Sequence, residues 1–270
     1  MKLRKKTLII IGAIFVVMIV VLHISSRILL LGSFAQLEER NTRRNVERVL
    51  SALSDELSSL DATTADWAAW DDTYAFIEDA NQEYVESNLV DETLTTLSLH
   101  LMLFTNSSGQ TIFAKTADLN SEEEMSLPQT LQEHLATNNF LLRFPDTESR
   151  ITGIILLPEG PMLVASRPIL TSEEEGPIRG ALIMGRYLDE LEIKRLAEMT
   201  HLSLIVDYFE DSQMRLDFQA AVSSAPEETP ILVRPLNEQS IAGYAILKDI
   251  YDKPILVLRA NMSRDIYKQG

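Results

Sequence analysis

The sequence LHLMLFTNSSGQTIFAKTAD, at residues 99–118, joins two apolar runs through the polar turn Asn106-Ser107-Ser108-Gly109. Asn and Gly favour tight turns because both tolerate positive φ angles, and each run has the length of an ordinary strand. A β-hairpin is therefore predicted here, as the first pair of strands of an antiparallel sheet.

Two further strand-rich segments lie downstream, beyond a helix predicted over residues 126–138 with Pro128 in its first turn. Residues 151–170 have the pattern of a second hairpin that turns at Pro158-Glu159-Gly160, and residues 178–189 form a third predicted strand. A hairpin, a helix and three antiparallel strands follow in an order that resembles a sensory fold of the Per-Arnt-Sim (PAS) or Cache type.

A shorter cycle of the same plan follows. Its helices are expected over residues 190–202 and 216–224. Its strands are expected over residues 203–209, 231–236, 241–250 and 254–262. We therefore predict an α+β fold with tandem PAS-like or Cache-like antiparallel sheets and flanking helices.

Upstream of the hairpin, an apolar stripe predicts a long helix that ends at about Leu60. Apolar residues recur at spacings of four and three, the period of a helix with one apolar face, at Val46, Leu50, Leu53, Leu57 and Leu60. The stripe suits two interpretations equally. It could pair with a second copy of the chain as a homodimeric coiled coil, or it could pack on the chain's own core.

Residues 61–64, with the sequence DATT, interrupt this stripe and offer caps for a new helix. The following run DWAAWDDTYAFI, residues 66–77, is predicted to be helical. Its apolar face would carry Trp67, Trp70, Tyr74 and Ile77. A further helical segment is expected from Gln82 to Thr96.

Residues 7–22 read TLIIIGAIFVVMIVVL without a charge, and a second apolar run ends at Leu31. A bilayer span needs about 20 apolar residues, so residues 7–31 are predicted to form a transmembrane helix that continues into the long helix. Four cations before Thr7 would hold residues 1–6 in the cytoplasm and place the rest on the periplasmic or extracellular side. A cleaved signal peptide is less favoured, because the apolar stretch is long and no convincing cleavage site follows.

The net charge of −16 is unevenly distributed along the chain. Residues 1–34 hold five basic and no acidic residues, which leaves 19 basic against 40 acidic residues in the remainder. So acidic a domain repels nucleic acid and anionic lipid surfaces, and neither is expected as its partner. The chain has no Cys, which excludes disulfides, thiolate metal sites and a Cys nucleophile.

Motifs of catalysis and cofactor binding are absent from the sequence. There is no GxSxG, HExxH, Gly-rich phosphate loop or EF-hand pattern. The four His residues have no metal-ligand spacing, and the consecutive Glu residues at 122–124 and 173–175 cannot easily converge on one ion. We therefore expect no enzyme activity, no cofactor and no metal site.

The densest candidate for a ligand-binding site is the segment from Trp67 to Tyr74. Aromatic walls with nearby acids suit a small polar or cationic ligand. The candidate residues of this segment are Trp67, Trp70, Asp71, Asp72 and Tyr74. The alternative is that the aromatic residues pack the helix onto the sheet and the aspartates serve as caps, and aromatic stripes favour that interpretation.

Arg167 and Arg186 complete the candidate ligand-binding set. Each lies within an otherwise apolar predicted strand, where a buried guanidinium needs a carboxylate partner. That carboxylate could come from the aspartates of the Trp67–Tyr74 segment, which would be a structural ion pair. It could also come from a ligand, which would be recognition of an anion.

The run DWAAWDDTYAFIEDANQEYVESNL, residues 66–89, resembles the signature of the CHASE domain of the fourth type, an extracellular sensor of bacterial and archaeal receptors. The resemblance extends more loosely to GALIMGRYLD at 180–189 and NMSRDIYKQG at 261–270. In such receptors a second membrane helix leads to a HAMP segment and then to a histidine kinase or a cyclic-di-GMP enzyme. The resemblance therefore implies a sensory role whose output part lies outside these residues.

Four regions are expected along the chain. They are a cytoplasmic basic tail at 1–6, a transmembrane helix at 7–31, a membrane-distal sensor module with its long N-terminal helix at 32–189, and a smaller membrane-proximal PAS-like module at 190–270.

These regions predict the extracytoplasmic sensory part of a signal-transduction receptor of the inner (cell) membrane, as in a two-component system. Its ligand would be an unidentified small molecule or a periplasmic partner. The alternative is a membrane-tethered periplasmic scaffold that binds a partner without signalling.

Overall fold

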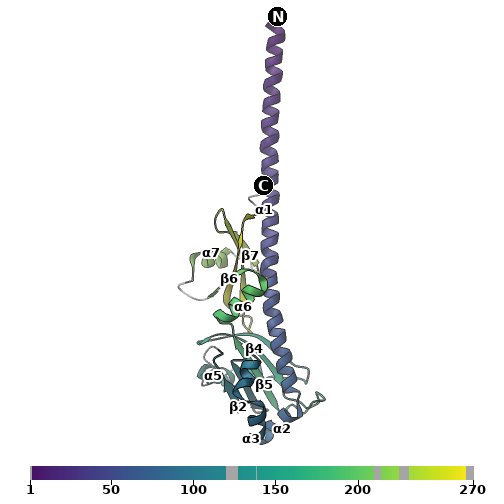
Figure 1. Ribbon diagram of the computed structural model, residues 1–270, viewed down its shortest axis with the longest axis vertical. Helices are drawn as coiled ribbons and strands as arrows, with labels where there is room; N and C mark the ends of the chain where they lie inside the picture. The colour runs from purple at the N-terminus through teal and green to yellow at the C-terminus, as the bar shows by residue number, and fades with distance from the viewer. Residues whose placement is uncertain (1, 120–126, 138, 210–213, 225–230, 266–270) are drawn as a thin grey trace.

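Figure 1 shows the computed structural model, which describes residues 2–119, 127–137, 139–209, 214–224 and 231–265. One long helix, α1 (Lys2–Ala68), forms the spine of the molecule. Two antiparallel sheets lie along its C-terminal half, and its N-terminal part extends well beyond both of them. The predicted α+β fold with two antiparallel sheets and flanking helices is confirmed.

The first sheet has five strands in the order β2-β1-β5-β4-β3. Its strands are β1 (Leu101–Asn106), β2 (Thr111–Thr116), β3 (Ile151–Leu157), β4 (Gly160–Pro168) and β5 (Gly180–Tyr187). Helices α5 (Gln129–Thr137) and η1 (Asn139–Leu142) connect β2 to β3. Both predicted hairpins, the helix between them and the third strand are confirmed.

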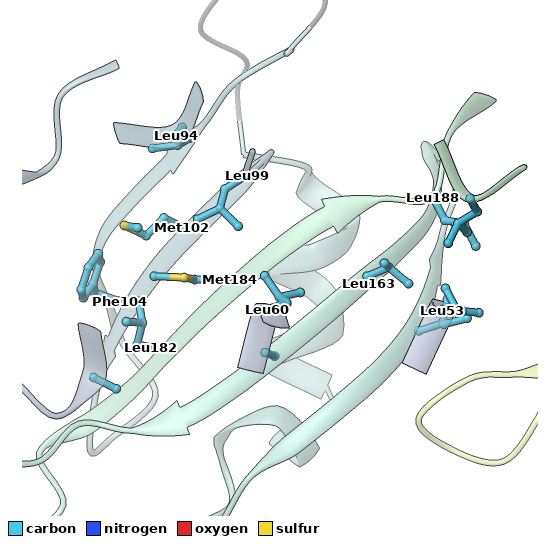
Figure 2. Close-up of a cluster of buried hydrophobic side chains, with 14 of the residues drawn as sticks. Leu53, Leu60, Leu94, Leu99, Met102, Phe104, Leu163, Leu182, Met184 and Leu188 are labelled. Carbon is cyan, nitrogen blue, oxygen red and sulfur yellow. The ribbon is translucent and has the colours of Figure 1, made fainter. Parts of the chain in front are cut away.

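Both faces of the first sheet are covered, because side chains alternate between two apolar layers along each strand. Met102, Phe104 and Met184 pack toward α1, whereas Leu103 and Ile183 belong to a second cluster beneath α5 and η1. Figure 2 shows the first layer, in which Leu53 and Leu60 of α1 meet leucines and methionines of β1, β4 and β5. The first layer also continues into the second sheet, through Leu256 and Leu258.

The second sheet has four strands in the order β6-β9-β8-β7. Its strands are β6 (Ser203–Tyr208), β7 (Ile231–Pro235), β8 (Ser240–Lys248) and β9 (Pro254–Ser263). The helix α6 (Glu190–Thr200) precedes the sheet, and α7 (Leu216–Ser224) covers the face opposite α1 by packing Phe218 against Tyr244. These helices and strands agree with the second cycle that the sequence predicts.

The apolar stripe of α1 packs on the chain's own core. Val46 is 0% exposed, Leu53 5% and Leu60 2%, while Leu50 and Leu57 are partly buried against the same cluster. The interpretation in which the stripe serves the chain's own core is therefore confirmed. Association with a second copy of the chain stays a prediction.

The predicted break at residues 61–64 is wrong, because α1 continues without interruption to Ala68. The hydroxyls of Thr63 and Thr64 donate to the carbonyl oxygens of Ser59 and Leu60, four residues earlier, at 3.0 and 2.7 Å. Hydroxyls bonded in this way lie within the helix and are not available to cap a new one.

The single helix predicted over residues 66–77 is also wrong. The chain leaves helical geometry at Trp70, which has φ −135° and ψ 130°, and Ala69 forms a parallel bridge with Leu170 at the end of β4. A new helix, α2 (Asp71–Asp79), then begins. The helical segment expected from Gln82 to Thr96 is divided into α3 (Gln82–Asn88) and α4 (Asp91–Thr96).

Among the residues that the structure describes, no helix is long and apolar enough to cross a membrane. The membrane span predicted over residues 7–31 therefore stays a prediction.

Candidate functional site

The aromatic residues of the candidate segment form a chain of ring contacts that leads into the core. Trp67 meets Trp70 edge to face with ring centroids 6.0 Å apart, and Trp70 lies 6.0 Å from Tyr84. Tyr84 in turn stacks on Phe76 at 4.5 Å. Burial raises the pKa of Tyr84 to about 12, and its hydroxyl bonds to that of Thr73 at 2.6 Å. The cluster fixes α2 and α3 against the sheet.

The polar residues of the same segment hold the loop that follows β4. The Asp71 amide donates to Ser172 Oγ, and the Ser172 amide donates to Asp71 Oδ1, both at 3.0 Å. The Tyr74 hydroxyl donates to the Pro177 carbonyl at 3.0 Å, and the guanidinium of Arg179 lies 3.7 Å from the centre of the Tyr74 ring. Asp72 is exposed in the first turn of α2.

Both candidate arginines pair with carboxylates of α1, and neither pairs with the aspartates of the Trp67–Tyr74 segment. Arg167 forms two parallel hydrogen bonds with Asp61, at 2.7 and 2.6 Å. Arg186 bonds to Glu56 at 3.0 Å and to the Ser98 carbonyl at 2.7 Å. These pairs attach α1 to two neighbouring strands of the first sheet.

A cavity of about 490 Å³ lies at the junction of the two sheets, and we call it the inter-sheet cavity. Its volume lies within the range of ordinary small-molecule pockets. Its walls come from the start of β4, the end of β5, the first turn of α6, the end of β6, and β9. Apolar side chains contribute to the wall at Leu188, Ile193, Val206 and Leu256.

His100 and Tyr187 form the polar end of the inter-sheet cavity. The His100 side chain is buried, and its Nδ1 accepts a hydrogen bond from the Tyr187 amide at 3.2 Å. Burial lowers the pKa of His100, against the opposing influence of Asp189 and Asp118. His100 is therefore neutral at pH 7, with its proton on Nε2.

The Tyr187 hydroxyl is buried without a hydrogen-bond partner among the described residues. Burial and the negative charge of Glu159 raise the pKa of Tyr187, so its hydroxyl stays protonated at neutral pH. Asp207 Oδ2 also lacks a partner in the described part of the chain, but Asp207 shares its strand face with Val257 on the side that α7 covers, and its Oδ1 pairs with Arg215 at 3.4 Å. Buried polar atoms are nearly always hydrogen-bonded, which makes the Tyr187 hydroxyl a candidate for contact with a ligand.

A second cavity, of about 380 Å³, adjoins the first and shares His100, Tyr187 and Asp189 with it. This α1 cavity is lined by Glu56 and Ser59 of the long helix. Glu56 pairs with Arg186 of β5 and with Arg195 of α6, and Arg195 also pairs with Glu192. One carboxylate of α1 therefore links the first sheet to the helix that leads into the second sheet.

The sequence-predicted site residues and the inter-sheet cavity are largely separate. Of the seven candidates, Arg186 lines the α1 cavity, and neither cavity is lined by Trp67, Trp70, Asp71, Asp72, Tyr74 or Arg167. A role of those residues in ligand binding stays a prediction.

In the sequence, His100 lies within an apolar predicted strand, which favours a hydrogen-bonded core residue, and the structure confirms this interpretation. Tyr187 and Val206 are absent from the sequence-based candidates, because no local motif marks them and they come from strands of different sheets.

Two antiparallel sheets lie along one long helix, and a cavity lies where the sheets meet. The chain belongs to the CHASE4 domain family, whose match covers residues 52–206. The resemblance that the sequence suggested is thereby confirmed, and with it the predicted sensory function.

A curated relative supports the same assignment. The chain is 29% identical, over 273 residues, to the methanogenesis regulatory histidine kinase FilI of Methanothrix harundinacea (strain 6Ac). The match covers 100% of this chain and 30% of FilI, so the chain spans less than a third of that relative.

Two solved structures share the fold at 12% identity. The extracellular domain of vpHK1S-Z8 superposes with a TM-score of 0.51 over 85% of this chain and 94% of that one. A domain of a sensory box/GGDEF family protein from Vibrio parahaemolyticus gives the same TM-score over 85% and 98% of the two chains.

Proposed function

We propose that this chain is the extracytoplasmic ligand-binding region of a membrane signalling receptor and that its ligand occupies the inter-sheet cavity. The observation that carries the proposal is the position of this cavity in a CHASE4 chain. It lies between the two sheets, and it shares three residues with the α1 cavity. A ligand there would touch both sheets at once.

Signalling requires that the ligand bind one arrangement of the two sheets better than another. The wall residues Leu188 and Asp189 directly follow β5 of the first sheet, and Val206 and Leu256 belong to the second sheet. Closure around a ligand would therefore move α6 and β6 relative to β5. Because Glu56 pairs with both Arg186 and Arg195, such a movement would change the forces on α1.

The proposal includes a membrane anchor over residues 7–31. The described large apolar side chains of α1 between Leu8 and Ile24 are from 50% to 71% exposed, on a part of the helix that neither sheet covers. Apolar side chains that are exposed to this extent along a helix are expected to be surrounded by lipid. The four cations before Thr7 would then keep the N-terminus in the cytoplasm, with both sheets on the opposite side.

At its base, α1 is joined to the end of the second sheet. Arg264, which follows β9, bonds twice to Glu38 of α1, at 3.0 and 2.9 Å, and the Glu38 side chain is 4% exposed. The part of the helix nearest the proposed membrane and the last described strand are thereby held together. A change at the cavity could reach the membrane through either element.

The proposal is tested by thermal unfolding of the full chain, purified in detergent micelles, against a library of small metabolites grouped by charge. A compound that binds only the folded state raises Tm in a saturable way. We expect one chemical class to do so.

Val206→Phe, which fills the inter-sheet cavity, should abolish that shift. Val233→Phe, the same change at a half-buried strand position outside the lining, should not. Unchanged Tm values across all charge classes would support the membrane-tethered scaffold instead.

A further inference from the structure

The turn between β8 and β9, residues 249–253, reaches from the second sheet to the first. The Ile250 amide donates a hydrogen bond to the Ile154 carbonyl at 2.9 Å. Ile154 belongs to β3, which is an edge strand of the first sheet. In the described part of the chain no strand of the first sheet pairs with a strand of the second, so the β8–β9 turn makes this bond outside any shared ladder.

The side chains of the β8–β9 turn also dock on the first sheet. Ile250 packs against the apolar cluster beneath α5 and η1. Gly153 of β3 makes room for it, because a Cβ atom at position 153 would lie 2.7 Å from Ile250 Cγ2, closer than carbon atoms pack. The ring centroid of Tyr251 lies 5.5 Å from that of Phe140 in η1. The turn therefore contacts both the edge strand and the helix that follows α5.

The β8–β9 turn holds its own shape through internal bonds. Asp249 Oδ1 accepts hydrogen bonds from the amides of Tyr251 and Lys253, both at 2.9 Å. The Asp249 amide donates to the Lys253 carbonyl at 2.9 Å, and Lys248 Nζ pairs with Asp252 Oδ1 at 2.8 Å. An aspartate that bonds to the backbone two residues on is a self-contained turn. Such a turn can leave the first sheet as a unit and keep these bonds.

The two sheets are joined differently on their two sides. On the α1 side, Leu256 and Leu258 are 1% and 2% exposed, within the cluster that extends from the first sheet to the second. On the side of the β8–β9 turn, Ile250 is half-buried, and Tyr251 and Phe140 are 37% and 38% exposed. Contacts that bury little apolar surface separate at a smaller cost in free energy. The joint along α1 is therefore the stronger one, and the joint at the turn is the one that can open.

The elements that meet at the β8–β9 turn continue into walls of the inter-sheet cavity. Beyond Ile154, β3 ends at Leu157, whose partner Gly160 lines the cavity. On the other side, β9 begins directly after the turn at Pro254, and Leu256 of β9 lines the cavity too. Separation at the turn would therefore move the walls that β4 and β9 supply away from each other.

We propose that the β8–β9 turn is a releasable latch between the two sheets. Engaged on β3 and η1, it holds the sheets in the arrangement described above. Released, it lets the second sheet turn away from the first about the buried core along α1, as in a hinge motion. This inference goes beyond the proposed function, because it concerns how the sheets are held together and requires no ligand.

A disulfide can lock the latch. Ile250 Cβ lies 3.9 Å from the position that a Cβ atom would take at residue 153. Bonded cysteines have Cβ atoms about 3.5 to 4.5 Å apart, so Gly153→Cys with Ile250→Cys should form a disulfide on oxidation. The chain has no other Cys. Comparing the oxidised and reduced forms of this one variant cancels the effect of the φ angle of +157° at residue 153.

Amide hydrogen exchange of the full chain in detergent micelles, followed by mass spectrometry, measures the effect of the lock. We expect oxidation to slow exchange about tenfold in the segment with Tyr187 and Leu188, because water reaches these cavity residues when the sheets separate. Ile250→Cys alone, with Gly153 retained, should show no change under the same oxidation. Failure of the disulfide to form, or slowing confined to residues near the turn, would overturn the proposal.

Spin-label distances test the release of the latch. Labels at Thr111→Cys on β2 and Glu198→Cys on α6 report on the first sheet relative to the helix beside the second. Labels at Thr111→Cys and Glu92→Cys on α4 are the control pair, because both positions lie on the side of the first sheet.

Ile250→Ala combined with Tyr251→Ala should shift or broaden the Thr111–Glu198 distance distribution and leave the control pair unchanged. Leu236→Ala is the matched control, since Leu236 is also 37% exposed but lies in the turn between β7 and β8. It should change neither distribution. Identical Thr111–Glu198 distributions in the latch variant and in the parent chain would overturn the proposal, as would an equal change in the control pair.

These outcomes are separate from those that test the proposed function. If the locked and released variants behave as expected while no library compound raises Tm, the latch stands and the ligand-binding function fails. If a compound raises Tm and Val206→Phe abolishes its effect, but oxidation leaves exchange at Tyr187 and Leu188 unchanged, the cavity is a sensor site and the latch is wrong.

Discussion

At the scale of single residues, Asp61 supplies the carboxylate partner that the buried Arg167 needs, and a ligand is not required for this role. Asp61 is 9% exposed in its side chain, and its two oxygens accept two hydrogen bonds from Arg167, which is 19% exposed. The geometry is that of a bidentate pair. Because Asp61 is buried, its negative charge depends on Arg167 for compensation. The pair therefore fixes α1 to β4.

Arg167→Met should lower the free energy of unfolding by about 3 kcal/mol, because Asp61 would remain buried without its main partner. Denaturant unfolding measures the change. Arg150→Met is the control, since Arg150 is 70% exposed and 3.9 Å from the same carboxylate, and its loss should cost less than about 0.5 kcal/mol. Equal costs for the two variants would show that Arg167 is not held in this pair.

His100 should make stability depend on pH. Burial is the main cause of its lowered pKa, and Arg186 adds to it, while Asp189, Asp118 and Glu192 oppose it. The unfolded chain therefore takes up the His100 proton at a higher pH than the folded chain. The contribution of neutral His100 to the free energy of unfolding is fully present above the pKa that His100 has in the unfolded chain. It is lost as the pH falls from that pKa toward the lower pKa of His100 in the folded chain.

His100→Gln should abolish this part of the pH dependence. The difference in unfolding free energy between the parent chain and the variant should shrink below about pH 6.5, by at most about 1.4 kcal/mol per pH unit. Denaturant unfolding at a series of pH values from 5 to 8 measures it. Parallel pH profiles for the two proteins would contradict the assignment of a neutral, buried His100.

At the scale of elements, the strands and most helices could be predicted because their patterns are local. Each hairpin has its own turn sequence, and the strands carry continuous apolar runs because both faces of the first sheet are covered. Apart from the division of the segment 82–96 into two helices, the errors lie between residues 61 and 71, where distant contacts decide the backbone. Arg167 engages Asp61 within α1, and Leu170 draws Ala69 into a bridge that ends the helix.

The inter-sheet cavity could not be predicted for a related reason. Its lining comes from Tyr187 at the end of β5, Asp189 before α6, Val206 in β6 and His100 just before β1. Of the three strands β1, β5 and β6, only β1 and β5 are paired neighbours, and β6 belongs to the other sheet. The order of strands within the sheets, which sequence spacing does not encode, brings the residues together.

The contact between α1 and β8 depends on Gly243. A Cβ atom at this position would lie 2.4 Å from Val46 Cγ2 and 3.1 Å from Thr42 Cγ2. Gly243→Ala should therefore lower the free energy of unfolding by about 1 to 3 kcal/mol, as overpacking does. Val46→Ala in the same chain should recover part of the loss, which a double-mutant cycle measures.

Gly32→Ala is the control for that substitution, since nothing lies within 4 Å of the added atom on α1. It should be neutral or slightly stabilising in a helix. A Gly243→Ala variant as stable as the parent chain would show that α1 and β8 are not in close contact.

At the scale of the whole molecule, α1 gives both sheets a common support. The buried cluster that begins at Val49 and Leu53 of α1 includes residues of β1, β4 and β5 and continues to Leu256 and Leu258 of β9. A disturbance where the sheets meet therefore acts on one continuous core. The uncovered N-terminal part of the same helix leads away from that core.

The proposed topology predicts where the C-terminal end lies. A phosphatase reporter that folds only outside the cytoplasm, fused after Gly270, should be active in cells. Replacing Lys2, Arg4, Lys5 and Lys6 with Glu should reduce that activity, because basic residues hold the N-terminus inside. Activity of a reporter that folds only in the cytoplasm, and inactivity of the phosphatase, would contradict the membrane topology.

The central claim, that a ligand between the sheets alters their relation to α1, is tested most directly by a distance. The chain has no Cys, so spin labels can be placed solely at Ser54→Cys on α1 and Glu198→Cys on α6, with Ser51→Cys and Ser58→Cys within α1 as the rigid control. We expect a saturating compound that raises Tm to shift the Ser54–Glu198 distance distribution and to leave the control distribution unchanged. Identical Ser54–Glu198 distributions with and without that bound compound would contradict the claim.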